Sequence, residues 1–112
     1  MSAQHAISHV HADWRGDEAS RAAVLARIDV GLDNLKACVR FLVAQGVAVQ
    51  HVSFDRHQRR PRITVAASPL LHTIFRDDCA AGQHWDILAG RTAYDYVAVR
   101  YECEIRWVEV PQ

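Results

Sequence analysis

Arginine is concentrated in one short stretch of this sequence, where four of seven consecutive residues carry a guanidinium group. The basic and imidazole side chains of the stretch are Arg56, His57, Arg59, Arg60 and Arg62. A guanidinium group binds planar oxyanions through paired hydrogen bonds, so the cluster suits carboxylates of a protein or phosphates of a nucleic acid. We predict that these residues bind a macromolecular partner.

The charge balance favours a protein as that partner. Thirteen basic and thirteen acidic side chains cancel, so the chain has no net charge to attract a polyanion from a distance. Residues 50–76 nevertheless hold five basic and one acidic side chain, whereas residues 77–112 hold three basic and seven acidic ones. Nucleic acid is therefore one alternative partner, and a solvated turn whose arginines pair with the acidic C-terminal third is a second interpretation.

A second set of residues, His72, Cys79 and His84, has the side-chain types of a nucleophile pair or a mixed metal site. The spacing matches no closed zinc pattern, and the neighbouring Asp77 and Asp78 oppose formation of a thiolate. We therefore expect a protein that is not an enzyme. A small enzyme or ligand-binding protein that uses these three residues is the alternative.

A third group lies near the N-terminus, where a helix would place His5 and His9 on one face, close to His11 and Asp13. This spacing alone is weak evidence for a metal site, because no further metal-binding motif accompanies it. We expect neither a metal nor a cofactor.

Length and composition indicate one domain, residues 1–112, in which 1–16 form a flexible N-terminal segment. Half of the residues are apolar and 23% are charged, which is typical of a globular chain. The three cysteines form no Cys-x-x-Cys pair, and no stretch has the length of a membrane span or the core of a signal peptide. We expect a cytoplasmic protein that makes no membrane contact.

The elements that must position these residues begin with a long helix over 18–45. Its apolar residues recur every three or four positions: Leu25, Ile28, Leu32, Leu35, Val39 and Leu42. Asp17 suits the N-cap and Gly46 the left-handed residue that ends a helix. Gly31 is the place where we expect a kink or a break.

Two strands, 47–54 and 62–67, follow as a hairpin whose tip carries the arginines. The apolar phase of the first strand shifts near Gln50 and His51, which predicts a bulge. Ser68 followed by Pro69 predicts the start of a short second helix.

The rest of the chain reads as a loop over 76–90, with a short strand at 85–88, and one long bent strand from Val97 to Val110. The alternation from Val97 to Trp107 indicates that the strand is half buried, and no turn-forming residue interrupts it. The fold class is therefore α+β, with the long helix packed on an antiparallel sheet of three to four strands. Strand edges could pair two chains, so a homodimer is one expected assembly. Trp85, Tyr94 and Tyr96 could anchor a protein partner.

The layout of these elements resembles small accessory proteins encoded on bacterial phages, plasmids and integrative elements. The resemblance is carried by Gly46, the strand 47–54, the Pro-Arg entry of 61–65 and the closing strand Cys103 to Trp107. It covers about a third of the chain and transfers no site residue. It implies an accessory role, such as binding and blocking host machinery, and we predict a binding or regulatory protein of that kind.

Overall fold

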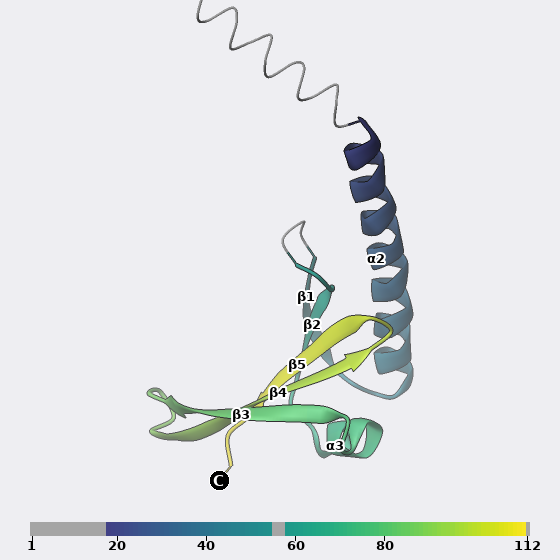
Figure 1. Cartoon of the computed structure of the whole chain (residues 1–112). Helices are drawn as coiled ribbons and strands as arrows, with labels where there is room; N and C mark the ends of the chain where they lie inside the picture. Colours follow the sequence, from purple (N-terminus) through teal and green to yellow (C-terminus); the bar gives the residue numbers. More distant parts are fainter. Residues whose placement is uncertain (1–17, 55–57, 112) are drawn as a thin grey trace, which may run out of the picture. The chain divides into compact units, whose positions relative to one another are not determined.

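The protein is described by a computed structural model that covers residues 18–54 and 58–111 (Figure 1). Its contacts divide the chain into two units, 1–30 and 31–112, which we describe separately. In chain order the elements are α2 (Glu18–Ala44), β1 (Val49–Ser53), β2 (Arg62–Val65), α3 (Pro69–Phe75), β3 (Cys79–Asp86), β4 (Arg91–Arg100) and β5 (Cys103–Glu109).

The helix α2 continues through Gly31, so this glycine does not divide it into two helices. Gly31 is buried for a different reason. A Cβ at this position would lie 2.4 Å from ring atoms of Phe54, which is closer than two carbon atoms can approach. The glycine therefore makes room for the Phe54 ring at the end of β1.

The C-terminus of α2 ends as predicted, at Gly46, which adopts a left-handed conformation with φ of +86°. The N–H of Gly46 donates to the carbonyl of Val43, and the N–H of Val47 donates to that of Leu42. This pair of bonds is the Schellman motif, which satisfies carbonyls that the helix leaves without a partner. The predicted N-cap, Asp17, lies outside the described residues.

The predicted apolar stripe of α2 is only partly correct. In the second unit Leu42 is buried and Leu35 and Val39 are partly buried against the core, but Leu32 is exposed, as is Leu25 in the first unit. The buried line instead includes Cys38. Two of the buried residues of α2 are small, because the Phe54 ring lies against Gly31 and the Cys103 thiol lies against Cys38.

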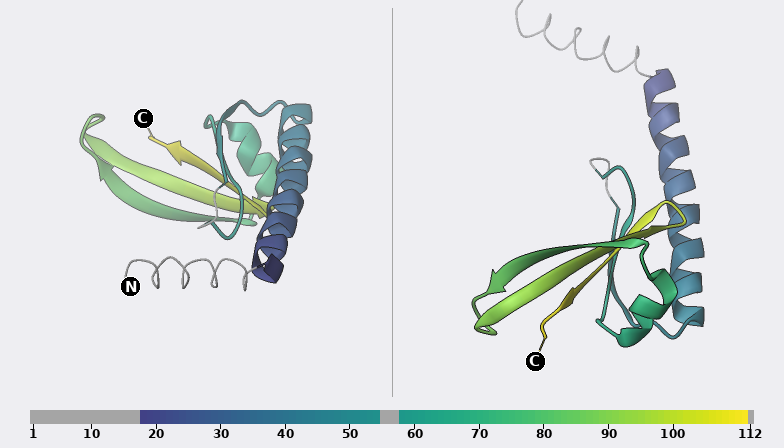
Figure 2. Two further views of the ribbon diagram at one scale, coloured as in Figure 1. Left: turned by 90° about the horizontal axis from the view of Figure 1, so that it is seen from above. Right: turned by 60° about the horizontal axis from the view of Figure 1, so that its bottom comes forward.

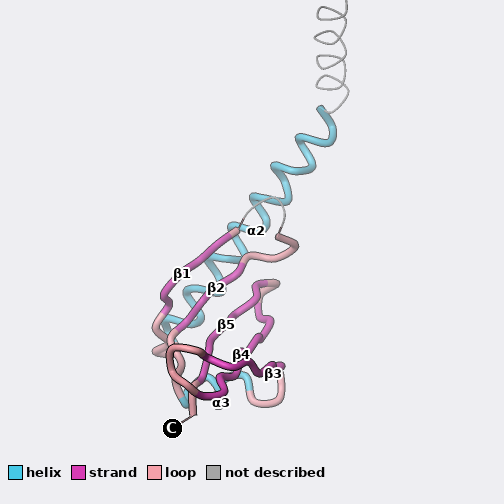
Figure 3. The backbone as a smooth tube through the Cα atoms, turned by 90° about the vertical axis from the view of Figure 1, so that its left-hand side faces the viewer, coloured by secondary structure: helices cyan, strands magenta, loops and turns pink. Residues whose placement is uncertain are grey.

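In the described part of the chain, the sheet has five strands in the order β1-β2-β5-β4-β3. The pairs β1–β2, β3–β4 and β4–β5 are antiparallel, whereas β2 and β5 run parallel. The α+β class is confirmed, and the predicted antiparallel sheet of three to four strands is a mixed sheet of five. The tube in Figure 3 shows β1 and β2 running side by side.

Two local predictions in this part of the chain are confirmed. The β1–β2 register shifts between Val49 and His51, which places a bulge at Gln50. The Ser68 hydroxyl accepts a hydrogen bond from the Leu70 N–H at 3.2 Å, with Pro69 as the first residue of α3. Both features follow from neighbouring residues, so the sequence shows them directly.

The segment predicted as a loop over 76–90 is largely a strand. β3 pairs with β4 without interruption from Cys79↔Ala98 to Asp86↔Arg91, and only 87–90 form the turn. The prediction failed because Ala, Gly and Gln, which are poor strand formers, occupy the middle of β3. The strand also lacks the alternation of large apolar and polar residues that indicates a half-buried strand. Pairing with the long β4 overrides that local preference.

The long bent strand predicted from Val97 to Val110 is a tight hairpin. Tyr101 and Glu102 form a two-residue turn with φ of 54° and 58°, and Arg100 pairs with Cys103. Such a turn usually contains Asn or Gly, so neither residue signals it. The turn also changes which residues face the core. On β4 Ala98 is buried and Val99 is exposed, and on β5 the buried Ile105 lies opposite Ala98.

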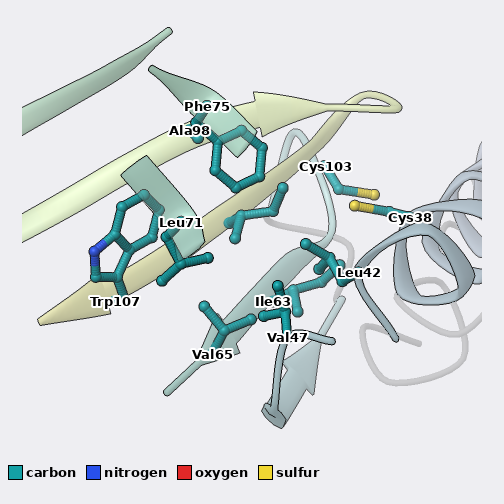
Figure 4. Close-up of a cluster of buried hydrophobic side chains, with 11 residues drawn as sticks. Cys38, Leu42, Val47, Ile63, Val65, Leu71, Phe75, Ala98, Cys103 and Trp107 are labelled. Atoms are coloured by element: carbon teal, nitrogen blue, oxygen red, sulfur yellow. The ribbon is translucent and has the colours of Figure 1, made fainter. Parts of the chain in front are cut away.

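One face of the sheet packs against the second half of α2 and against α3 to form the core (Figure 4). The cluster takes residues from both helices and from three strands. Its members are Cys38, Leu42, Val47, Ile63, Val65, Leu71, Phe75, Ala98, Cys103, Ile105 and Trp107. Trp107, the largest of them, stacks on Phe75 at 5.9 Å between ring centroids, so β5 and α3 are held together at the core.

Candidate interaction surface

The arginine cluster is only partly available to a partner. Arg60 pairs with Glu102 at 3.7 Å, and the Arg62 Nε lies 3.3 Å from a Glu104 carboxylate oxygen. The Arg62–Glu104 pair follows from the parallel register of β2 and β5, which places these two residues opposite each other. These contacts match the second interpretation, in which the arginines pair with the acidic C-terminal third.

The same Glu104 carboxylate also accepts a hydrogen bond from Arg106 Nε at 3.2 Å and forms an ion pair with Arg106 Nη2 at 3.0 Å. The side chains of this group are half exposed, so water screens the charges and the pairs add little stability. Arg59 is exposed. Arg56 and His57 lie outside the described residues.

The three residues of the alternative catalytic set are not brought together. His72 Nε2 bonds to Glu109 Oε2 at 2.5 Å, and His84 Nδ1 bonds to Asp95 Oδ2 at 2.7 Å. The Cys79 thiol donates to the backbone carbonyl of Arg76. Cys79 and His84 are also separated by an odd number of positions on β3, so they project from opposite faces of the sheet. The structure therefore assembles no nucleophile pair from these residues.

His72 instead belongs to a cluster that the sequence reasoning missed. Glu109 Oε2 accepts a second hydrogen bond, from Trp107 Nε1 at 2.8 Å, and the Tyr96 ring stacks on Trp107 with centroids 5.2 Å apart. Desolvation, and then the charge of Glu109, raise the pKa of the Tyr96 phenol. The spacing of Trp107 and Glu109 on one strand face is the only sequence signal. Because Glu109 bonds both to His72 and to Trp107, the cluster fastens α3 to the end of β5.

Cys38 and Cys103 face each other between α2 and the start of β5 (Figure 4). Both thiols are fully buried, and burial raises the pKa of Cys38 to about 12 and also raises that of Cys103. A thiol that stays protonated is a poor nucleophile. These two cysteines therefore serve the core rather than chemistry.

The hairpin of β3 and β4 ends in an exposed turn, residues 87–90. Its turn lies away from α3, and its distal residue pairs extend beyond the end of β5 (Figure 2). Large apolar side chains gather at this end: Trp85 is 63% exposed, Ile87 85% and Leu88 100%. We call 85–88 the apolar tip.

The apolar tip has a defined backbone. The Gly90 N–H donates to the Asp86 carbonyl at 2.8 Å, and the Ala89 N–H donates to the Asp86 carboxylate at 3.0 Å. Gly90 adopts a φ of +67°, which glycine reaches without steric cost. The turn therefore presents Ile87 and Leu88 to solvent in a fixed arrangement. Of the three predicted aromatic anchors, Trp85 is exposed, whereas Tyr94 and Tyr96 are half buried.

β3 also forms an edge of the sheet. It is bonded to β4 on one side, and among the described strands none pairs with its other side. Six of its eight residues are exposed, and Asp86, at its end, carries its only formal charge. An edge of this kind offers a row of backbone donors and acceptors to another strand.

Two further findings concern the described residues. None of the helices in the described part is both long and apolar enough to cross a membrane. Within residues 18–54 and 58–111, no three side chains of the metal-binding types lie close enough to share an ion. The predicted histidine group, His5, His9, His11 and Asp13, lies outside those ranges.

Comparison with protein-family models, with curated proteins and with solved structures finds no match to this chain. The resemblance to accessory proteins of mobile elements accordingly stays a prediction.

Proposed function

We propose that the chain is a protein-binding module rather than an enzyme, and that it binds through β3 and the apolar tip. The observation that carries the proposal is the edge of β3, which is eight residues long and which, among the described strands, pairs with β4 alone. An extended segment of a partner can add to such an edge through backbone hydrogen bonds. The exposed Trp85 supplies the kind of aromatic anchor that dominates binding energy at protein interfaces.

The proposal shifts the contact from the arginine cluster to the opposite edge of the sheet. Arg60 and Arg62 already bind Glu102 and Glu104, so a partner's carboxylates would have to compete with them. Of the described arginines in the cluster, Arg59 is the exposed one, and we retain it as a second contact point. The role implied by the resemblance, blocking of host machinery, requires only binding of this kind and belongs to the same proposal. So does a cytoplasmic location, which the three free cysteines support.

Capture experiments with a tagged chain test this proposal. The tagged chain would capture proteins from a cell lysate to which untagged chain has been added, once with nuclease and once without. Bound proteins would be identified by mass spectrometry. We expect a stoichiometric protein partner that survives nuclease. Ala81→Lys, which places a charge in the middle of β3, should abolish capture.

The matched control is His51→Lys, which adds the same charge to an exposed position on β1, the other edge strand. Capture should persist in this variant. Capture that is lost with nuclease would favour nucleic acid, and full capture by Ala81→Lys would show that β3 is not the contact.

A further inference from the structure

The edge of β3 lacks the features with which sheets normally avoid pairing with other chains. Such features are bulges, prolines, lysines and short length. β3 pairs with β4 in unbroken register over eight residues and contains neither proline nor lysine. It is therefore able to accept a strand along its whole length, about 26 Å at 3.3 Å per residue.

The symmetry of a dimer restricts how two copies of β3 could pair. Two identical edge strands that pair antiparallel are related by a two-fold axis perpendicular to the sheet. This axis keeps each sheet face on its own side, and paired residues face the same way. Two residues that lie opposite each other must therefore be an even number of positions apart in the sequence. One residue, the residue on the axis, then lies opposite its own copy. Gly82 and Gln83 are the two central candidates.

The side chains distinguish these two registers. With Gly82 on the axis, Asp86 of one chain lies opposite Asp78 of the other, so two carboxylates repel each other twice in the dimer. With Gln83 on the axis, Asp86 lies opposite Ala80 and no like charges meet.

The Gln83 register also matches the sizes of the side chains. Trp85 of one chain lies opposite Ala81 of the other, and His84 lies opposite Gly82. Gln83 meets its own copy, and a carboxamide can both donate to and accept from an identical group. Every large side chain in the paired region therefore has a small or self-complementary partner.

The apolar tip gains cover in the same arrangement. Trp85, 63% exposed in the single chain, would lie over the neighbouring strand. The dimer would leave only the two copies of β1 as sheet edges, and each has a bulge at Gln50 that interrupts further pairing.

We propose that two copies of this chain form a symmetric dimer in which their β3 strands pair antiparallel with Gln83 on the two-fold axis. The inference rests on the proposed function, since it uses the same edge, and it names the partner as a second copy. Pairing of the two β3 strands would join the two five-stranded sheets into one sheet of ten strands.

Cross-linking of an introduced cysteine tests the register. In a Cys79→Ser background, Gln83→Cys would be treated with a short bis-maleimide. We expect nearly complete conversion to a covalent dimer, because the two introduced thiols lie opposite each other. Ala89→Cys, in the exposed turn of the same hairpin, is the matched control and should yield little dimer.

The mass in solution tests the assembly independently. Light scattering during gel filtration should give twice the 12.6 kDa mass of the chain, and Ala81→Lys should return it to the monomer with an unchanged circular dichroism spectrum. A monomeric wild-type chain over the micromolar range would overturn the dimer. If the chain were monomeric but Ala81→Lys still abolished capture of a different protein from the lysate, the dimer would be wrong and the proposed function would stand. Cross-linking of Ala89→Cys but not Gln83→Cys would overturn the register.

Discussion

β1 and β3 are the two edges of one sheet, yet β1 spans five residues with a bulge and β3 spans eight residues in regular register. Beyond β1 the chain enters the arginine-rich hairpin, whose Arg60 and Arg62 are paired within the molecule. Beyond β3 the chain forms the apolar tip, whose side chains face solvent. The edge with the charged hairpin is thus closed to pairing, and the nearly uncharged edge is open.

If β3 is the contact, as we propose, a cluster of charge need not mark the surface that binds. Charged residues are conspicuous in a sequence, but on a sheet they find partners on neighbouring strands, as Arg62 and Glu104 do. A run of alanine, glycine and glutamine is inconspicuous. On an edge strand it leaves the backbone accessible.

The largest effect is expected from adding the same charge to each edge. Ala81→Lys should weaken self-association about a hundredfold, because each dimer would contain two lysines that face Trp85 across the pair. His51→Lys on β1 should change it less than about threefold. Sedimentation equilibrium of both variants would measure this contrast, and equal effects would remove the distinction between the edges.

Deleting Gln50 should open the closed edge. Without this residue, Val49 and His51 would follow each other opposite Val65 and Thr64, which are themselves adjacent, so the β1–β2 register becomes regular. We expect β1 then to pair between molecules and to produce assemblies larger than a dimer, detected by light scattering. Substituting Gln50→Ala keeps the bulge and provides the control. An unchanged mass for the deletion variant would show that something other than the bulge closes β1.

Alkaline pH should affect the core more than either edge. The pKa of Cys38 is about 12 in the folded protein against an ordinary value of 9.0, so the unfolded chain releases this proton first. The thiol's contribution to stability is complete below pH 9 and is lost as the pH rises from there towards 12. The melting temperature should fall over this range, and less steeply in Cys38→Ala. Equal slopes would show that the thiol does not titrate on unfolding.

The smallest effect is expected at the arginines beside β1. Arg62→Ala should lower the free energy of unfolding by less than about 1 kcal/mol, because its pair with Glu104 is half exposed. Dimer formation should be unaffected. Urea unfolding measures the first quantity, and a loss of several kcal/mol would mean that the pair contributes far more than its exposure implies.

The features that the sequence revealed are those set by neighbouring residues. Gly46 ends α2, Ser68 and Pro69 begin α3, and the phase shift at Gln50 marks the bulge. Each depends on a conformational or hydrogen-bonding preference that acts over a few residues.

The features that the sequence did not reveal depend on distant partners. Tyr101 and Glu102 adopt a turn conformation that their own preferences oppose, since β4 and β5 pair on both sides of it. β3 is a strand because β4 lies beside it. The open edge was missed for the same reason, because the order of strands in a sheet cannot be read from their individual patterns.

The parallel pairing of β2 with β5 also has a consequence for how the chain folds during synthesis. Arg62 and Glu104 lie opposite each other although 42 positions separate them along the chain, whereas β3, β4 and β5 are joined by short turns. Contacts that close a long loop form late, because the entropy of closure is lost before the contact is gained. Trp107 and Ile105, which fill the core, lie on β5 and leave the ribosome after both helices. We expect the helices to find a complete sheet to pack against only after β5 has been synthesised.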